Sequence, residues 1–142
     1  MANSATRPPR PWTVTVVIVL AIIVFLEQII GGVVGIVEAR RLDEAFGWGA
    51  TDSLTYEQVI AGCVAAIVLS ILGLGATLAF GRGSRNGTIA LAILTTLTVA
   101  SALIAMRGYA DFRPAVGPLR LVGGIAVLYL LFQQRDDAAP GR

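Results

Sequence analysis

Histidine and lysine are absent from this chain of 142 residues, and Cys63 is its only cysteine. These absences exclude bis-histidine haem ligation, histidine-based metal or proton sites, cysteine-cluster metal sites and an intramolecular disulfide. The remaining serine and threonine residues are isolated, so no nucleophile, base and oxyanion donors gather in one place. We therefore expect a protein that is not an enzyme and that holds no metal and no cofactor.

Charge is also scarce. Charged residues make up 14% of the chain, hydrophobic residues make up 56%, and the mean hydropathy is +0.77. This leaves too little polar material to cover a surface that faces water. Four long stretches contain no charged residue at all, namely 11–26, 58–81, 86–106 and 121–134. The composition therefore predicts a membrane protein.

The uncharged stretches predict the fold class. A helix needs roughly 20 mostly apolar residues to cross a hydrocarbon layer about 30 Å thick. We expect an all-α polytopic membrane protein, a bundle of four transmembrane helices that occupies residues 12–134. The predicted helices are 12–37, 56–80, 88–106 and 115–134. An Arg/Pro-rich tail (1–11) and a polar tail (135–142) are predicted to be disordered.

The connectors carry signals for helix ends and for orientation. Residues 55–58 (Thr-Tyr-Glu-Gln) predict a capping box, and the first helix is expected to extend to Phe46 and stop at Gly47. The hairpin at 81–87 contains Arg82 and Arg85 and no acidic residue. Basic residues in short loops favour the cytoplasmic side, so we expect a multi-pass cell-membrane protein with both termini in the cytoplasm.

Arg82 and Arg85 are expected to contact anionic lipid headgroups. Their hairpin lacks the Gly-Lys-Ser/Thr ending and the preceding strand of a phosphate-binding loop. We therefore expect membrane lipids as partners and neither a nucleotide nor a nucleic acid.

Glu27 lies near the middle of the first predicted span, where an ionised carboxylate is costly and usually faces protein. The helical rise brings Arg120, near the start of the fourth span, within side-chain reach of it. Three interpretations stay open. The two residues form an ion pair; or Glu27 is protonated and hydrogen-bonded to Gln28 or a hydroxyl of the third span, while Arg120 snorkels to the interface; or Glu27 takes part in transport.

Small residues recur at helical spacing and predict close helix packing, because little besides shape and hydrogen bonding holds helices together in lipid. Gly31 and Gly35 share a helical face with Glu27, so we expect that face to pack against protein. The residues predicted at helix contacts are Gly31, Gly35, Gly62, Ala66 and Gly73. The hydroxyls of the second and third spans either line a polar path or, as we expect, bond to carbonyls of their own helices.

Two families resemble the chain. The Arg/Pro-rich leader with its Trp-Thr-Val start (residues 7–14), the hairpin at 81–87 and four evenly sized spans resemble small four-span membrane proteins of actinobacteria, a resemblance that implies no activity. Glu27, Gly31 and Gly35 also resemble the first helix of the small multidrug resistance transporters. The chain departs from the transporters in its long acidic first connector and in its third and fourth spans.

These observations lead to two hypotheses of function. The first is a small membrane protein without catalytic activity that acts through helix packing, as a homo-oligomer or as an accessory subunit of a larger membrane complex. The alternative is a proton- or cation-coupled transporter or channel that uses Glu27.

Overall fold

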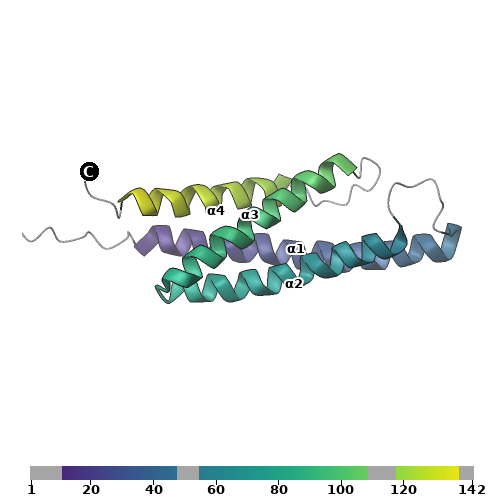
Figure 1. The fold of residues 1–142 in the computed structure, drawn as a ribbon, viewed down its shortest axis with the longest axis horizontal. Coiled ribbons are helices and arrows are strands. Elements are labelled where there is room, and N and C mark those ends of the chain that lie inside the picture. Colours follow the sequence, from purple (N-terminus) through teal and green to yellow (C-terminus); the bar gives the residue numbers. More distant parts are fainter. Residues whose placement is uncertain (1–10, 48–54, 109–117, 138–142) are drawn as a thin grey trace, which may run out of the picture.

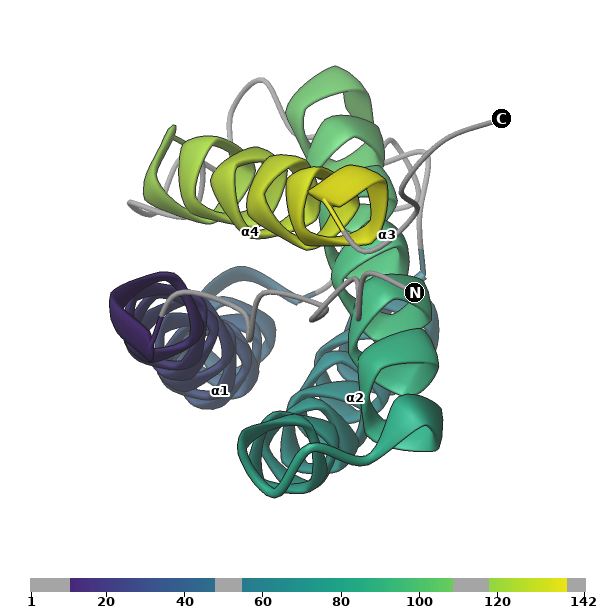
Figure 2. The ribbon, with the colours of Figure 1, turned by 90° about the vertical axis from the view of Figure 1, so that its left-hand side faces the viewer.

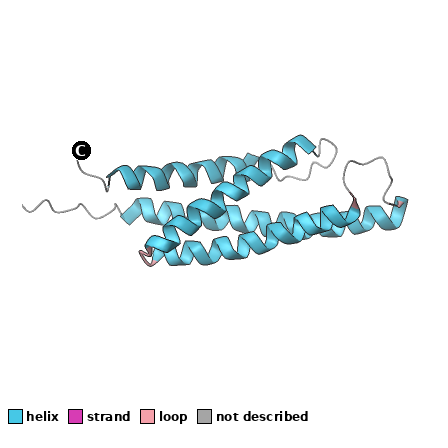
Figure 3. Cartoon of the chain, in the orientation of Figure 1, coloured by secondary structure: helices cyan, strands magenta, loops and turns pink. Residues whose placement is uncertain are grey.

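The structure, a computed structural model, describes residues 11–47, 55–108 and 118–137. Within these ranges the chain is helical and contains no strand (Figure 3). The helices are α1 (Pro11–Phe46), α2 (Tyr56–Gly81), α3 (Arg85–Gly108) and α4 (Pro118–Asp137). The predicted all-α class is therefore confirmed for the described residues.

Three helices are long and apolar enough to cross a membrane, over Trp12–Ala45 in α1, Tyr56–Gly81 in α2 and Arg85–Leu103 in α3. The apolar part of α4 is shorter and runs over Leu119–Gln134. At the helical rise it covers about 24 Å, against about 30 Å for the hydrocarbon layer. Length and composition thus support three spans, and the apolar part of α4 within the described residues is shorter than the predicted span 115–134.

The helices run up and down in an antiparallel bundle (Figure 1). Helix α1 packs against α2 and α4, and α3 packs obliquely across α2 and α4 (Figure 2). The start of α1, the α2–α3 hairpin and the end of α4 lie together, at what we call the hairpin end (Figure 1). At the opposite end α1 projects past α4, because its 36 residues extend about 54 Å.

Helix boundaries follow local chemistry. The hydroxyl of Thr55 accepts a hydrogen bond from the backbone N–H of Gln58. The side-chain Oε1 of Gln58 accepts one from the backbone N–H of Thr55, as the predicted capping box requires. Helix α1 continues to Phe46 and stops where Gly47 takes a φ of 67°, with its N–H donated to the Asp43 carbonyl at 3.0 Å. A left-handed glycine suits such a stop because it has no Cβ.

The predicted tails differ from the structure at both bundle boundaries. Pro11 is the first residue of α1, a position where its missing N–H costs nothing. Residues 135–137 belong to α4, although they were predicted to lie in a disordered tail. Polar residues can continue a helix once its membrane part has fixed the first turns, since elongation is easier than nucleation. Residues 1–10, 115–117 and 138–142, for which tails and a helix start were predicted, lie outside the described residues.

The α1–α2 contact follows a spacing of alternately three and four residues on both helices. On α1 this seam consists of Ala21, Phe25, Gln28, Gly32, Gly35 and Ala39. On α2 the inner seam consists of Val59, Cys63, Ala66, Ser70, Gly73, Thr77 and Phe80. Such a 3.5-residue period keeps one line of residues on a partner helix as the pair winds around itself.

The α1 seam adds one glycine that the sequence did not single out. Gly32 is buried, and a Cβ built on it would lie 2.7 Å from Cγ1 of Ile67, while Gly31 and Gly35 are both partly buried. Gly35 does pack as predicted, because its Cβ would lie 2.8 Å from Sγ of Cys63. The prediction extended the face from Glu27 at a spacing of four, which drifts off a line of period 3.5.

Gly62 corrects the predicted set of helix contacts. It is exposed, and nothing lies within 4 Å of the position where its Cβ would be, so it makes no close helix contact within the described chain. Gly73, by contrast, faces α1 so closely that its Cβ would lie 2.3 Å from Cε1 of Phe25. Both glycines belong to one stripe of an ideal helix, but the 3.5-residue seam runs through Val59 and Cys63, three residues before and one residue after Gly62.

Candidate functional site

Glu27 and Arg120 form an ion pair inside the bundle. The Nε of Arg120 donates to Oε2 of Glu27 at 2.9 Å, and the two side chains are 7% and 20% exposed respectively. Of the interpretations that the sequence left open, the structure thus shows the ion pair. The pair keeps each charge compensated where water is scarce, which is the usual arrangement for ionisable residues within membranes.

Glycine residues on α4 bring Arg120 close enough to reach α1. A Cβ on Gly123 would lie 2.6 Å from Cγ2 of Val24, and one on Gly124 would lie 2.5 Å from Cγ2 of Val99 on α3. These contacts are within about one helical turn of Arg120. Neither glycine was predicted to pack, although the available signal was a Gly-Gly pair three and four residues after Arg120, a charge within a predicted span.

Gln28 is the most deeply buried polar side chain on α1. It is 1% exposed, and neither its Nε2 nor its Oε1 has a hydrogen-bond partner in the described protein. Gln28 belongs to the α1 seam between Phe25, which touches Gly73, and Gly32, which touches Ile67. On α2 the residue at the matching level is Ser70, which is 0% exposed. Gln28 on α1 and Ser70 on α2 therefore lie at the same level of the α1–α2 contact.

Helix α3 adds a further buried hydroxyl. Thr95 is 1% exposed and its Oγ1 has no partner in the described protein. A Cβ on Gly124 would lie 3.8 Å from Cγ2 of Thr95, which places the hydroxyl about one turn from the ion pair. The polar layer, as we call this level, consists of Glu27, Gln28, Ser70, Thr95 and Arg120.

Most hydroxyl groups of α2 and α3, Ser70 among them, donate hydrogen bonds to backbone carbonyls of the preceding turn. Ser70 donates to the Ala66 carbonyl at 2.7 Å, and Thr77 donates to the Gly73 carbonyl at 2.8 Å. On α3, Thr88, Thr96 and Thr98 likewise donate to carbonyls four residues earlier. These bonds consume the hydroxyl hydrogens, as expected for packing rather than for a polar path. Among the described residues, no three His, Cys, Asp or Glu side chains come together as a metal site.

The outward face of α2 carries a second line of residues at the same alternating spacing. This outer seam consists of Ala61, Ala65, Val68, Leu72 and Gly75. All five residues are exposed, and nothing lies within 4 Å of a Cβ built on Gly75. On an ideal helix this line lies opposite the inner seam that contacts α1. Gly62, exposed beside Ala61, borders the outer seam.

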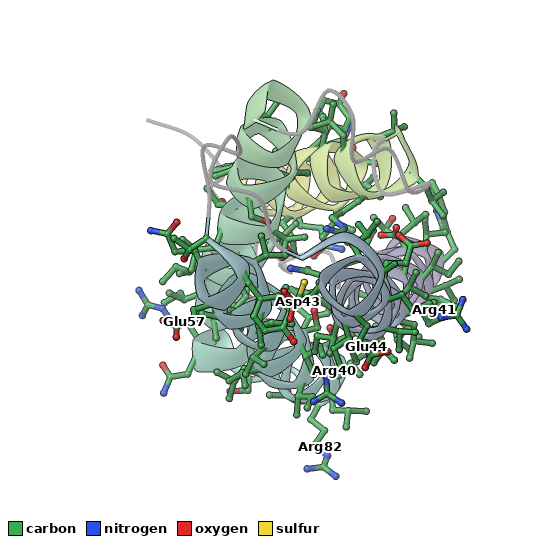
Figure 4. The ribbon with its side chains drawn as sticks, turned by 90° about the vertical axis from the view of Figure 1, so that its right-hand side faces the viewer. Arg40, Arg41, Asp43, Glu44, Glu57 and Arg82 are labelled. Carbon is green, nitrogen blue, oxygen red and sulfur yellow. The ribbon has the colours of Figure 1, made fainter. Side chains whose placement is uncertain are left out.

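Exposed arginine side chains lie at both ends of the bundle, but only at one end are acidic residues close to them in the sequence. Arg82 and Arg85 are exposed at the hairpin end, as is Trp12, whose surface is 58% exposed. At the projecting end of α1, Arg40 and Arg41 point away from the bundle (Figure 4). Acidic residues accompany the latter two at the end of α1, whereas the α2–α3 hairpin contains none.

Comparison with known proteins adds no family to this picture. The chain matches no protein-family model, no curated protein and no solved structure.

Proposed function

We propose that the protein is a membrane protein without catalytic activity that acts by packing the outer seam of α2 against a helix of another membrane protein. The partner helix belongs to a second copy of this chain or to a larger membrane complex. The observation that carries the proposal is the outer seam itself, which follows a helix-packing period, contains Ala61, Ala65 and Gly75, and is exposed along its length.

The exposed face of α4 shows what distinguishes a packing surface from a lipid-facing one. That face presents large side chains only, namely Leu119, Val122, Ile125, Tyr129 and Phe132. The outer seam instead presents Ala61, Ala65 and Gly75 among its five residues. Lipid chains cover large and small side chains alike, whereas a second helix approaches closely only where residues are small. The outer seam therefore suits a helix better than it suits lipid.

The ion pair supports an assembly role over transport. A proton- or cation-coupled transporter needs a carboxylate that exchanges its ligand, but Glu27 is held by Arg120 at 2.9 Å. Replacing Glu27 by Gln gives a direct test in proteoliposomes. We expect no flux of protons or monovalent cations above that of empty liposomes with the wild-type protein, and flux that the substitution abolishes would favour the transport alternative.

Association through the outer seam is tested with bulky substitutions. We expect Ala65→Leu and Gly75→Leu to release the partner, or to convert oligomer to monomer, after extraction in mild detergent or nanodiscs. The matched controls are Val122→Leu and Ile125→Leu on α4, which change an exposed apolar residue and should leave association intact. Native mass measurement distinguishes a second copy from a different protein. A wild-type protein that is monomeric and co-purifies with nothing would contradict the proposal.

We also propose that α4 completes a fourth crossing of the cell membrane and that both termini are cytoplasmic. Supporting this orientation, exposed Arg82 and Arg85 lie in a hairpin free of acidic residues, where they can contact anionic headgroups. In a Cys63→Ala background, Asn86→Cys should react with an impermeant maleimide only after cells are permeabilised. Arg41→Cys should react in intact cells, and the reverse pattern would invert the orientation.

A further inference from the structure

Gln28 places an amide group in the bundle interior without a hydrogen-bond partner among the described residues. The side chain is 1% exposed, and neither of its polar atoms is hydrogen-bonded. An unpaired buried amide costs free energy in water-soluble proteins and more in a membrane, where no solvent is at hand. Because nearly all buried polar groups find a partner, we expect this amide to have one that is not among the described residues.

The level of Gln28 is enclosed by close contacts on both sides. Towards the hairpin end, Phe25 fills the space at Gly73, and towards the other end Gly32 lies directly against Ile67 and the Cys63 carbonyl. At the level between these contacts α2 presents Ser70, which is 0% exposed. A macromolecule cannot reach a group so enclosed. The missing partner is therefore small.

The charges near Gln28 indicate that its binding partner is neutral. The nearest carboxylate along the chain, Glu27, is already paired with Arg120. A cation bound at Gln28 would consequently bring an uncompensated charge into a medium of low dielectric constant, which is strongly unfavourable. A neutral molecule that both donates and accepts hydrogen bonds avoids that cost, and water is the smallest.

We propose that Gln28 binds water inside the bundle, between α1 and α2 at the level of Ser70. The Nε2 group of Gln28 donates to the water oxygen, and Oε1 accepts a hydrogen. Ser70 uses its own hydrogen in the bond to the Ala66 carbonyl, so its Oγ is left to accept. Water bound in proteins typically has two to four such partners.

Water-edited solid-state NMR tests the proposal on the full chain in lipid bilayers. Magnetisation is transferred from water protons to the protein and followed residue by residue. We expect the Gln28 side-chain amide to receive it several-fold faster than Leu91 and Val17, which are 0% exposed and apolar. Exposed Gln58 provides the wet reference. A Gln28 amide as slow as Leu91, or one correlated with a protein carbonyl, would overturn the proposal.

The variant Gln28→Met provides a second readout, because methionine has a similar length and no hydrogen-bonding amide. Transfer to Ser70 should fall several-fold in this variant, while transfer to Gln58 stays unchanged. Unchanged transfer to Ser70 in a folded variant would show that Gln28 does not hold the water. If the variant fails to fold, the wild-type measurement decides alone. Neither readout depends on whether the outer seam has a partner.

Discussion

The two faces of α2 carry the same kind of pattern and have different surroundings. The inner seam and the outer seam both alternate three- and four-residue steps, and both contain glycine. On the inner side Gly73 accommodates the ring of Phe25, whereas on the outer side nothing lies within 4 Å of Gly75. The comparison teaches that spacing and residue size identify a helix face that is able to pack. Whether that face does pack within the monomer depends on a large side chain from another helix, as Phe25 of α1 provides at Gly73.

The two faces can differ in this way because lipid, unlike water, does not drive apolar side chains to become buried. In water, any apolar face is driven to bury itself, so a pattern of apolar residues alone predicts burial. In lipid both faces of α2 are equally well solvated, and only shape and hydrogen bonding separate them. Substitutions at matched positions on the two faces should therefore have very different effects on the folded monomer.

The largest effect is expected from Gly73→Leu. A Cβ at this position would lie 2.3 Å from Phe25, so the side chain cannot be accommodated without separating α1 from α2. The free energy of unfolding, measured by SDS titration from mild detergent, should fall by about 3 kcal/mol, at the upper end of the usual cost of overpacking. Gly75→Leu on the outer face should be neutral or stabilise the monomer by less than about 1 kcal/mol through helix propensity. Equal losses at both positions would remove the distinction between the seams.

A smaller loss is expected when the ion pair is broken. Glu27→Gln leaves Arg120, 7% exposed in its side chain, with no negative partner among the described residues. Removing one partner of a fully buried pair costs about 3–5 kcal/mol, and the partial exposure of Glu27 reduces the expected loss to about 2 kcal/mol. Arg120→Met should cost less, because Glu27 can take up a proton whereas a guanidinium stays charged. The SDS titration of both variants checks this order, and the opposite order would contradict it.

A loss of about 1 kcal/mol is expected from Gly32→Ala. The added Cβ would lie 2.7 Å from the flexible Ile67 side chain but also 3.1 Å from the rigid Cys63 carbonyl oxygen, so only part of the contact can adjust. Helix propensity favours alanine by up to about 1 kcal/mol and offsets part of this cost. Unchanged thermal unfolding in detergent would show that α1 and α2 separate more easily than the contact indicates.

The smallest effect is expected from Gly62→Ala, for which the structure shows open space. With no contact to disturb, the change should be neutral or stabilise the monomer by less than about 1 kcal/mol through helix propensity. The same thermal measurement tests it beside Gly32→Ala. Destabilisation by Gly62→Ala would mean that this position packs within the monomer after all.

Helix ends were predictable where a local hydrogen bond or a backbone constraint defines them. The capping box at Thr55 and Gln58 and the stop at Gly47 need only neighbouring residues, and both are present. On α1 the contact at Gly35 was predicted, but the close contact at Gly32 was not. Identifying it required the 3.5-residue period of a wound helix pair, a property of two helices rather than one.

The polar layer was only partly predictable. Glu27 and Arg120 stood out because charges are rare in the spans, and the helical rise made their pairing possible without selecting it. Gln28 and Thr95 carry no such signal, since uncharged polar residues occur throughout membrane helices. The burial of Thr95 depends on how closely Gly124 lets α3 approach α4, and that of Gln28 on the α1–α2 contacts of Gly73 and Gly32.

By itself the sequence determined that the chain is helical and membrane-like, because uncharged apolar stretches must satisfy their backbone groups internally wherever water is absent. It also determined where several helices begin and end, since those signals act over one turn. Only the tertiary structure decided which face of α2 is occupied, that Arg120 reaches Glu27, and that Gln28 is enclosed. Each of these depends on the relative rotation of helices, which close contacts at Gly32, Gly73 and Gly123 fix to within one residue.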